Sequence, residues 1–246
     1  MSDLENRGLV LVANALSQST SHIRDFFISL RTELAFYMGC LHLQERFQNG
    51  AIPLQLPTMR PLGERVLAYT SLYDICLAIR LPSRVVSNSL SAAEKNTFII
   101  TGANQGGKST YLRSIGIACI MAQSGMFVCA EHFCCDIAHG IYTHYKHEED
   151  AGMTSGKLDE ELKRMDAIVD RLAPNDLVLF NESFAATNSR EGSAIARDIA
   201  LALSAKKNKG VFCHPFIGIR VPALPGETPR HPVLVRRTSK RWPTHL

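Results

Sequence analysis

The stretch Gly102-Ala103-Asn104-Gln105-Gly106-Gly107-Lys108-Ser109 decides the fold, because it joins two elements of different periodicity. The apolar run 97–101 before it predicts a buried strand, and residues 108–123 after it predict a helix. The stretch fits the pattern G-x-x-x-x-G-K-[ST], whose glycines let backbone N–H groups point at an anion. The start of the helix adds a partial positive charge. The sequence therefore predicts a phosphate site at this strand–helix junction.

Individual residues of this junction have expected roles in binding a nucleotide. Lys108 is expected to reach the outer phosphates, and the Ser109 hydroxyl is expected to coordinate Mg²⁺. The predicted nucleotide contacts are Gly102, Ala103, Asn104, Gln105, Gly106, Gly107, Lys108, Ser109 and Thr110.

Short apolar runs alternate with amphipathic helical stretches downstream of the junction. Residues 177–180 and 210–213 predict two more buried strands, while residues 158–172 and 195–203 carry helical stripes. Buried strands that alternate with helices predict an α/β fold, with a mostly parallel sheet and helices on both faces.

A long helix is predicted over residues 21–47, ahead of a connector that contains three prolines. Its apolar residues are spaced alternately four and three apart, which is the spacing of a helical seam. We therefore divide the chain into a helical segment over 1–60, an α/β domain over 61–212 and a tail over 213–246. The apolar residues of the seam are Ile23, Phe27, Leu30, Leu34, Tyr37 and Leu41.

The composition excludes several classes of protein. The chain has 246 residues, of which 46% are hydrophobic and 20% are charged, as in ordinary globular proteins. No apolar run approaches the roughly 18 residues that a membrane span needs, and no secretory signal is expected. Seven cysteines, an odd number, favour reduced thiols and a cytoplasmic location. The cluster Cys129, His132, Cys134 and Cys135 has a poor spacing for zinc, so we expect ordinary thiols there.

Polar residues follow the second and third predicted strands. Glu182 comes soon after residues 177–180, where a carboxylate can activate an attacking water. Asn181 can accept a hydrogen bond from a water bound to Mg²⁺, but it brings no charge, so we expect weaker organisation of the metal. His214 follows the third strand and is expected either to contact the terminal phosphate or to be a surface histidine in a turn.

These motifs together resemble the ATPase domain of the MutS-type DNA mismatch-repair proteins, in the form of a bacterial MutS-like branch. The resemblance rests on residues 101–110, residues 181–183, residues 186–192 and His214, and it covers about 97–212. It implies an ABC-type ATPase with the P-loop NTPase fold, ATP and Mg²⁺ as ligands, a homodimer, and DNA as a partner. It also implies that the helix 21–47 is the end of a lever; the alternative is a plain packing helix.

The resemblance further implies that a signature segment of the partner subunit contacts each nucleotide. Here the segment is 153–157, with Ser155 and Gly156 at the start of a helix, where N–H groups favour phosphate. The family's Ser-Thr pair is replaced by Leu158-Asp159. The alternative is a capped surface helix.

Two groups of charged residues border this segment. Asp159, Glu160 and Glu161 crowd the first turn of the predicted helix, where they would repel a phosphate if they face it. His144 and His147, on the other side, are expected in a solvated loop near the nucleotide.

The tail has two interpretations. Residues 211–246 contain six Lys and Arg, one acid and six prolines. In the first interpretation, the tail is a basic arm that meets nucleic-acid phosphates. In the second, the chain beyond Phe212 is not a native continuation of the domain, as after a shifted reading frame, and the sheet lacks edge elements. The basic residues are Arg236, Arg237, Lys240 and Arg241.

The sequence thus predicts an ATP-hydrolysing module that dimerises and couples its nucleotide state to DNA binding. Slow hydrolysis is expected, because Asn181 and residues 158–159 depart from the family pattern. A nucleotide-gated scaffold that closes on ATP without useful hydrolysis is the second hypothesis, and an inactive fragment is the third.

Overall fold

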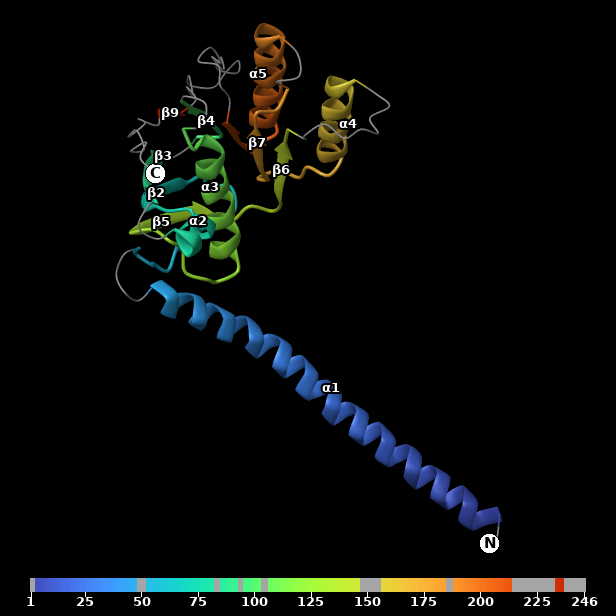
Figure 1. The fold of residues 1–246 in the computed structure, drawn as a ribbon. Coiled ribbons are helices and arrows are strands. Elements are labelled where there is room, and N and C mark those ends of the chain that lie inside the picture. Colours follow the sequence, from blue (N-terminus) through green and yellow to red (C-terminus); the bar gives the residue numbers. More distant parts are fainter. Residues whose placement is uncertain are drawn as a thin grey trace. The chain divides into compact units, whose positions relative to one another are not determined.

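The computed structural model describes residues 3–47, 52–81, 85–92, 95–102, 106–146, 156–184, 188–213 and 233–236 (Figure 1). The chain separates into two compact units, Met1–Gly50 and Ala51–Leu246. The first unit contains the 45-residue helix α1 (Asp3–Phe47). The prediction that this helix starts near residue 21 is wrong, because the apolar spacing continues back through Leu16 and Leu9 without a proline to stop it.

The second unit is built on a parallel sheet that has five strands among the described residues. All the pairings between neighbouring strands are parallel. The strands β4 and β8 are buried along their whole length, in agreement with the apolar runs that predicted them. In spatial order, the strands are β6 (Ile141–Tyr145), β7 (Leu177–Asn181), β8 (Lys209–Cys213), β4 (Thr97–Thr101) and β9 (Val233–Arg236).

Helices cover both faces of this sheet, as predicted. On one face, the helix α3 (Lys108–Gln123) approaches so closely that a Cβ on Gly116 would overlap the side chain of Leu179. The helices α4 (Lys157–Val169) and α5 (Ser189–Ala205) share a buried apolar cluster with Val178, Phe180 and Phe212. Successive side chains of a strand point to opposite faces, so Leu179 meets α3 while its two neighbours meet α4 and α5. The stacked rings of Phe180 and Phe212 lie 4.3 Å apart at the centre of that cluster.

A second sheet belongs to the same unit and was not predicted. Its four described strands follow the order β1, β5, β2, β3; β1 pairs with β5 in parallel, and the other pairings are antiparallel. A buried ion pair between Lys209 of β8 and Asp136 of β5 connects the two sheets. The elements of this part are β1 (Thr58–Arg60), β2 (Leu67–Leu72), the helix α2 (Ile75–Arg80), β3 (Asn88–Ala92) and β5 (His132–Asp136).

The strand β9 is the part of the tail beyond Cys213 that the structure describes. It pairs with β4, so the sheet has an edge strand that follows Phe212 in the chain. Arg236, one of the basic residues expected to meet nucleic acid, lies in this strand. Arg237, Lys240 and Arg241 lie outside the described residues.

Among the helices that the structure describes, none is both long enough and apolar enough to cross a membrane.

Candidate functional site

The junction of β4 and α3 has the backbone geometry that its glycines predict. Gly107 is the N-cap of α3 with a φ of 76°, a left-handed conformation that glycine adopts without steric cost. No acidic residue stands in the first turn of α3, so the helix start favours an anion. Lys108 is only 4% exposed, and its ammonium group donates a hydrogen bond to the Gly102 carbonyl oxygen at 3.1 Å.

The carboxyl ends of β7 and β8 bring further predicted residues to this junction. Asn181 is paired in register with Cys213, and the Glu182 N–H donates to the Cys213 carbonyl oxygen at 3.0 Å. Of the remaining predicted residues, Gly106, Ser109 and Thr110 are described beside the junction. Five lie outside the described residues: Ala103, Asn104, Gln105, Ser155 and His214.

Charged and polar groups of the predicted site lie near the thiol of Cys213 and shift its pKa. Burial raises its pKa to about 11, the cation of Lys108 lowers the pKa, Glu182 raises it, and a hydrogen bond with Ser109 lowers it. Ser109 therefore bonds the Cys213 thiol, and the charges of Lys108 and Glu182 lie close enough to affect it. Cys213 was not among the predicted site residues, although its place at the end of a buried strand was a usable signal.

The backbone at the end of β7 is strained. Glu182 has a φ of 51° and Phe184 a φ of 61°, the left-handed region that residues with a Cβ seldom occupy. Each such residue costs on the order of 1–3 kcal/mol and persists only where its surroundings hold it. The side chain of Glu182 is half-buried, which keeps it within reach of a ligand at the strand edge. Strain of this kind concentrates at functional sites and supports Glu182 as a candidate.

Asn181 has an oxygen whose hydrogen-bonding capacity is unused within the described part of the chain. Its Oδ1 atom is buried and has no hydrogen-bond partner there. An unsatisfied buried acceptor costs about 1–3 kcal/mol, and a water held by a metal ion would supply the missing donor. The Ser109 hydroxyl is a second oxygen at the same corner, since it bonds Cys213. Oxygen ligands suit Mg²⁺, so the residues present fit this ion.

The start of α4, predicted to contact a partner's nucleotide, carries less exposed negative charge than expected. Gly156 is its exposed N-cap, and Ser155 lies outside the described residues. Asp159 and Glu160 form ion pairs with basic residues one turn later on α4, at 2.7 and 3.4 Å. The prediction that three acids crowd the helix start is wrong for Glu161, which is 3% exposed and faces the protein interior.

His144 is buried, so the prediction of a solvated loop is wrong for this residue; His147 lies outside the described residues. His144 lies in β6 beside Phe180 of β7, on the face covered by α4 and α5. Its Nδ1 lies 2.7 Å from the Ser183 Oγ, and its Nε2 lies 3.0 Å from the Glu161 carbonyl oxygen. Its place in the stretch Ile141-Tyr142-Thr143-His144-Tyr145, which is rich in aromatic and β-branched residues, was the available signal.

Glu161, a residue of α4 that contacts the backbone after β7, was also not among the predicted site residues. Its Oε2 accepts a hydrogen bond from the Phe184 N–H at 2.8 Å. Burial raises the pKa of its carboxyl group, while the Phe184 N–H, Arg164 and Lys146 lower that pKa and Glu160 raises it. A carboxylate on α4 thus bonds the backbone two residues after Glu182.

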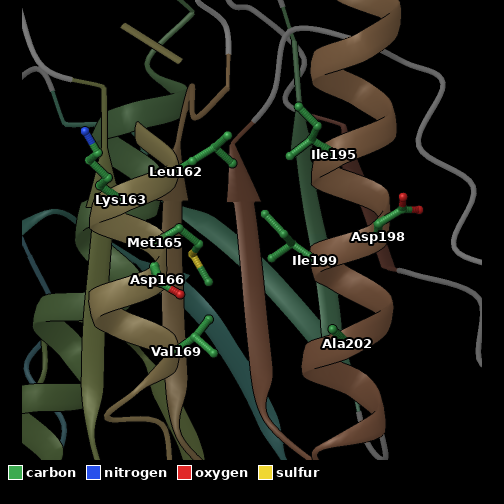
Figure 2. A pocket seen from close by; sticks show the side chains of 9 residues that line it. All are labelled: Leu162, Lys163, Met165, Asp166, Val169, Ile195, Asp198, Ile199 and Ala202. Atoms are coloured by element: carbon green, nitrogen blue, oxygen red, sulfur yellow. The ribbon is translucent and has the colours of Figure 1, made fainter. Parts of the chain in front are cut away.

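A cavity of about 610 Å³ lies between α4 and α5 (Figure 2). Its lining residues all belong to α4 and α5, and neither Lys108 nor Glu182 is among them. Among the residues that the structure describes, no three His, Cys, Asp or Glu side chains are grouped so as to hold a metal ion. The cavity is lined by Leu162, Lys163, Met165, Asp166, Val169, Ile195, Asp198, Ile199 and Ala202.

Two protein families match the sequence. Residues 98–222 match the family described as MutS domain V, and residues 1–50 match the MutS2 N-terminal domain. The first match covers just over half of the chain. It continues past Phe212 to residue 222, so the resemblance extends further than the motifs predicted and includes His214.

Several curated proteins are similar to this chain over part of their length. The endonuclease MutS2 of Thermus thermophilus is 30% identical over 176 residues, which are 71% of this chain and 23% of that protein. The DNA mismatch repair protein MutS of Thermus aquaticus is 32% identical, over 57% of this chain and 17% of that protein. The MutS protein homolog 4 of Mus musculus is 33% identical, over 54% and 14%. The matched region thus spans less than a quarter of each of these relatives.

Proposed function

Because the chain belongs to the MutS family, we propose that it is an ATP-binding and ATP-hydrolysing module that acts as a dimer and couples its nucleotide state to DNA binding. The geometry of the β4–α3 junction carries the proposal: α3 starts at the left-handed Gly107, the buried Lys108 bonds the Gly102 carbonyl oxygen, and the Glu182 N–H bonds the end of β8. A cation, a hydroxyl and a carboxylate beside a helix that starts at glycine support a P-loop NTPase site.

Each side chain of the site has its own role in hydrolysis. The N–H groups at the start of α3 bind phosphate oxygens, and Lys108 leaves the Gly102 carbonyl to stabilise the charge that develops on the outer phosphates. Mg²⁺, with Ser109 as a ligand and Asn181 bonded to one of its waters, would supply further charge neutralisation when bound. Glu182 takes a proton from the attacking water or orients it. His214 is proposed to bond the terminal phosphate.

A partner subunit completes the site in this proposal. Ser155 and Gly156 of one subunit contact the nucleotide of the other through the start of α4. DNA binding is proposed from the family, since the Thermus aquaticus relative is named a DNA mismatch repair protein.

Thermal unfolding and phosphate release test the proposal together. A ligand that binds only the folded chain must raise its Tm, so Mg-ATP is expected to raise the Tm and to be hydrolysed slowly. A Tm that does not respond to saturating Mg-ATP contradicts nucleotide binding. A Tm that rises without any phosphate release contradicts the enzyme but not the nucleotide site.

The nucleotide-gated scaffold is a second candidate, and Asn181 is the residue that favours it. An amide at this position brings no charge to the metal. Asn181→Asp separates the two functions by its effect on phosphate release. If the wild-type chain is an enzyme, the variant changes an existing turnover modestly, within about tenfold, the effect of roughly 1.4 kcal/mol on the barrier. If the chain is a scaffold, turnover is first seen in the variant or not at all.

A further inference from the structure

The backbone around Ser183 is strained on both sides, yet it is held by buried side chains from two other elements. Glu182 and Phe184 have φ values of 51° and 61°, and neither is glycine. Such geometry persists where several contacts determine it together. Upstream, the Glu182 N–H bonds the carbonyl oxygen of Cys213 on β8. The contacts downstream of Glu182 come from α4 and β6.

The contact from α4 is made by Glu161. Its Oε2 accepts a hydrogen bond from the Phe184 N–H at 2.8 Å, and the side chain is 97% buried. A hydrogen bond to a carboxylate is stronger than one between neutral groups. No other group is needed to satisfy this amide, so loss of the carboxylate would leave a buried N–H without its acceptor.

The contact from β6 is made by His144. Ser183 Oγ lies 2.8 Å from the His144 carbonyl oxygen and 2.7 Å from its Nδ1. Nε2 faces the Glu161 carbonyl oxygen at 3.0 Å, and because that oxygen only accepts, Nε2 carries a hydrogen. The imidazole also stacks on the Phe184 ring at 5.2 Å. One histidine thus contacts Ser183, Phe184 and the backbone of α4.

We propose that Glu161 and His144 are positioning residues, which hold the Ser183–Phe184 backbone so that Glu182 leaves β7 in its strained, active geometry. The proposal rests on the function assigned to Glu182 above. Glu161 lies at the amino-terminal end of α4, whose N-cap is Gly156, the proposed contact with the partner's nucleotide. A shift of this end of α4 therefore moves the acceptor that holds Phe184.

Steady-state hydrolysis of Mg-ATP by full-length variants tests this role. Glu161→Ala removes the acceptor, Glu161→Gln keeps an acceptor oxygen, and Asp166→Ala changes an exposed acid on the same helix as a matched control. We expect Glu161→Ala to lower kcat by about tenfold or more at unchanged KM, since small misplacements of catalytic groups have effects of this size. Glu161→Gln should restore most of kcat, and Asp166→Ala should match the wild type. Ser183→Ala, a smaller change, should also lower kcat at unchanged KM.

Hydrogen–deuterium exchange of the peptide that contains Phe184 gives a readout independent of turnover. The Phe184 amide should exchange faster in Glu161→Ala than in the wild type or in Glu161→Gln. Equal exchange in all three, or equal kcat in Glu161→Ala and the wild type, would overturn the positioning role while leaving the ATPase intact. A wild-type chain that binds Mg-ATP without hydrolysing it contradicts the proposed enzyme and, with it, a catalytic role for this contact.

Discussion

The helices α3 and α4 both start at a glycine, but the two starts are built differently. The first turn of α3 contains no acid, and the buried Lys108 lies beside its N-cap. The first turn of α4 contains Asp159 and Glu160, which satisfy the positive end of the helix dipole from within the chain. The start of α3 therefore favours the binding of an external anion, whereas the start of α4 is stable without one.

Under the proposed function, this difference separates what one chain does alone from what needs a second chain. The site at α3 is assembled from β4, β7 and β8 of a single subunit, so nucleotide binding should survive in a monomer. The contact proposed at α4 forms only when a partner brings its own nucleotide. Single substitutions at the two helix starts should consequently affect different quantities.

Lys108→Ala should have the largest effect, because it removes the cation that is proposed to face the outer phosphates. We expect turnover to fall by about a thousandfold or more, since removal of one electrostatic stabiliser costs about 10²–10³ and binding is weakened as well. The rise in Tm with Mg-ATP should be lost. If the variant kept both the Tm response and the turnover, the phosphates would bind elsewhere. The start of α3 would then not be the anion site that distinguishes it from the start of α4.

Glu182→Gln should separate binding from chemistry at the same site. The amide cannot accept a proton from water, and loss of a general base typically costs about 10²–10⁴ in rate. The Tm response to Mg-ATP should be retained, because Glu182 takes no part in holding the phosphates. Single-turnover phosphate release and thermal unfolding check the two halves of this prediction. Unchanged single-turnover release would remove Glu182 from the reaction.

Asp159→Asn should have a smaller effect, and it should change only the protein concentration at which the active dimer forms. Removing one negative charge at the start of α4 changes the interaction with a phosphate there by about 0.3–1 kcal/mol. Half-maximal specific activity should therefore be reached at about two- to fivefold lower protein concentration, with the plateau unchanged. Asp166→Asn, on the same helix, is the control. An equal shift in both variants would indicate a general charge effect and no contact at the helix start.

Glu161→Gln should have the smallest effect of these substitutions. The effect is a change in the free energy of unfolding that depends on pH. Burial raises the folded-state pKa of Glu161 above its unfolded value, against the lowering effects of the Phe184 N–H, Arg164 and Lys146. The wild type therefore loses stability relative to the variant as pH rises through that pKa. The difference in Tm, variant minus wild type, should increase from below pH 4.5 toward neutrality. A difference that is constant over this range contradicts burial of a titrating carboxyl group.

The local parts of this fold could be predicted from the sequence, and the long-range parts could not. The strand β4, the glycine turn and α3 are adjacent in the chain, and each has a clear pattern of its own. The second sheet was missed because its strands are short and weakly patterned; β3 reads Asn-Ser-Leu-Ser-Ala, and β1 has three residues between prolines.

The same limit applies to the candidate site. Residues in contiguous motifs, such as Lys108 and Glu182, could be selected from their spacing. The pairing of Glu161 with Phe184, 23 residues apart, depends on how α4 packs over the end of β7. The sequence pattern sets the periodicity of α4 but not the direction in which Glu161 faces, so a buried acceptor was taken for a surface acid.

The measurement that tests the central claim most directly is Mg-ATP turnover per subunit over a wide range of protein concentration. If two chains build each complete site, specific activity should rise with concentration and then level off, and Asp159→Asn should move only the midpoint of the rise. Specific activity that is the same at every concentration would contradict the composite site. Absence of activity at every concentration would contradict the enzyme itself.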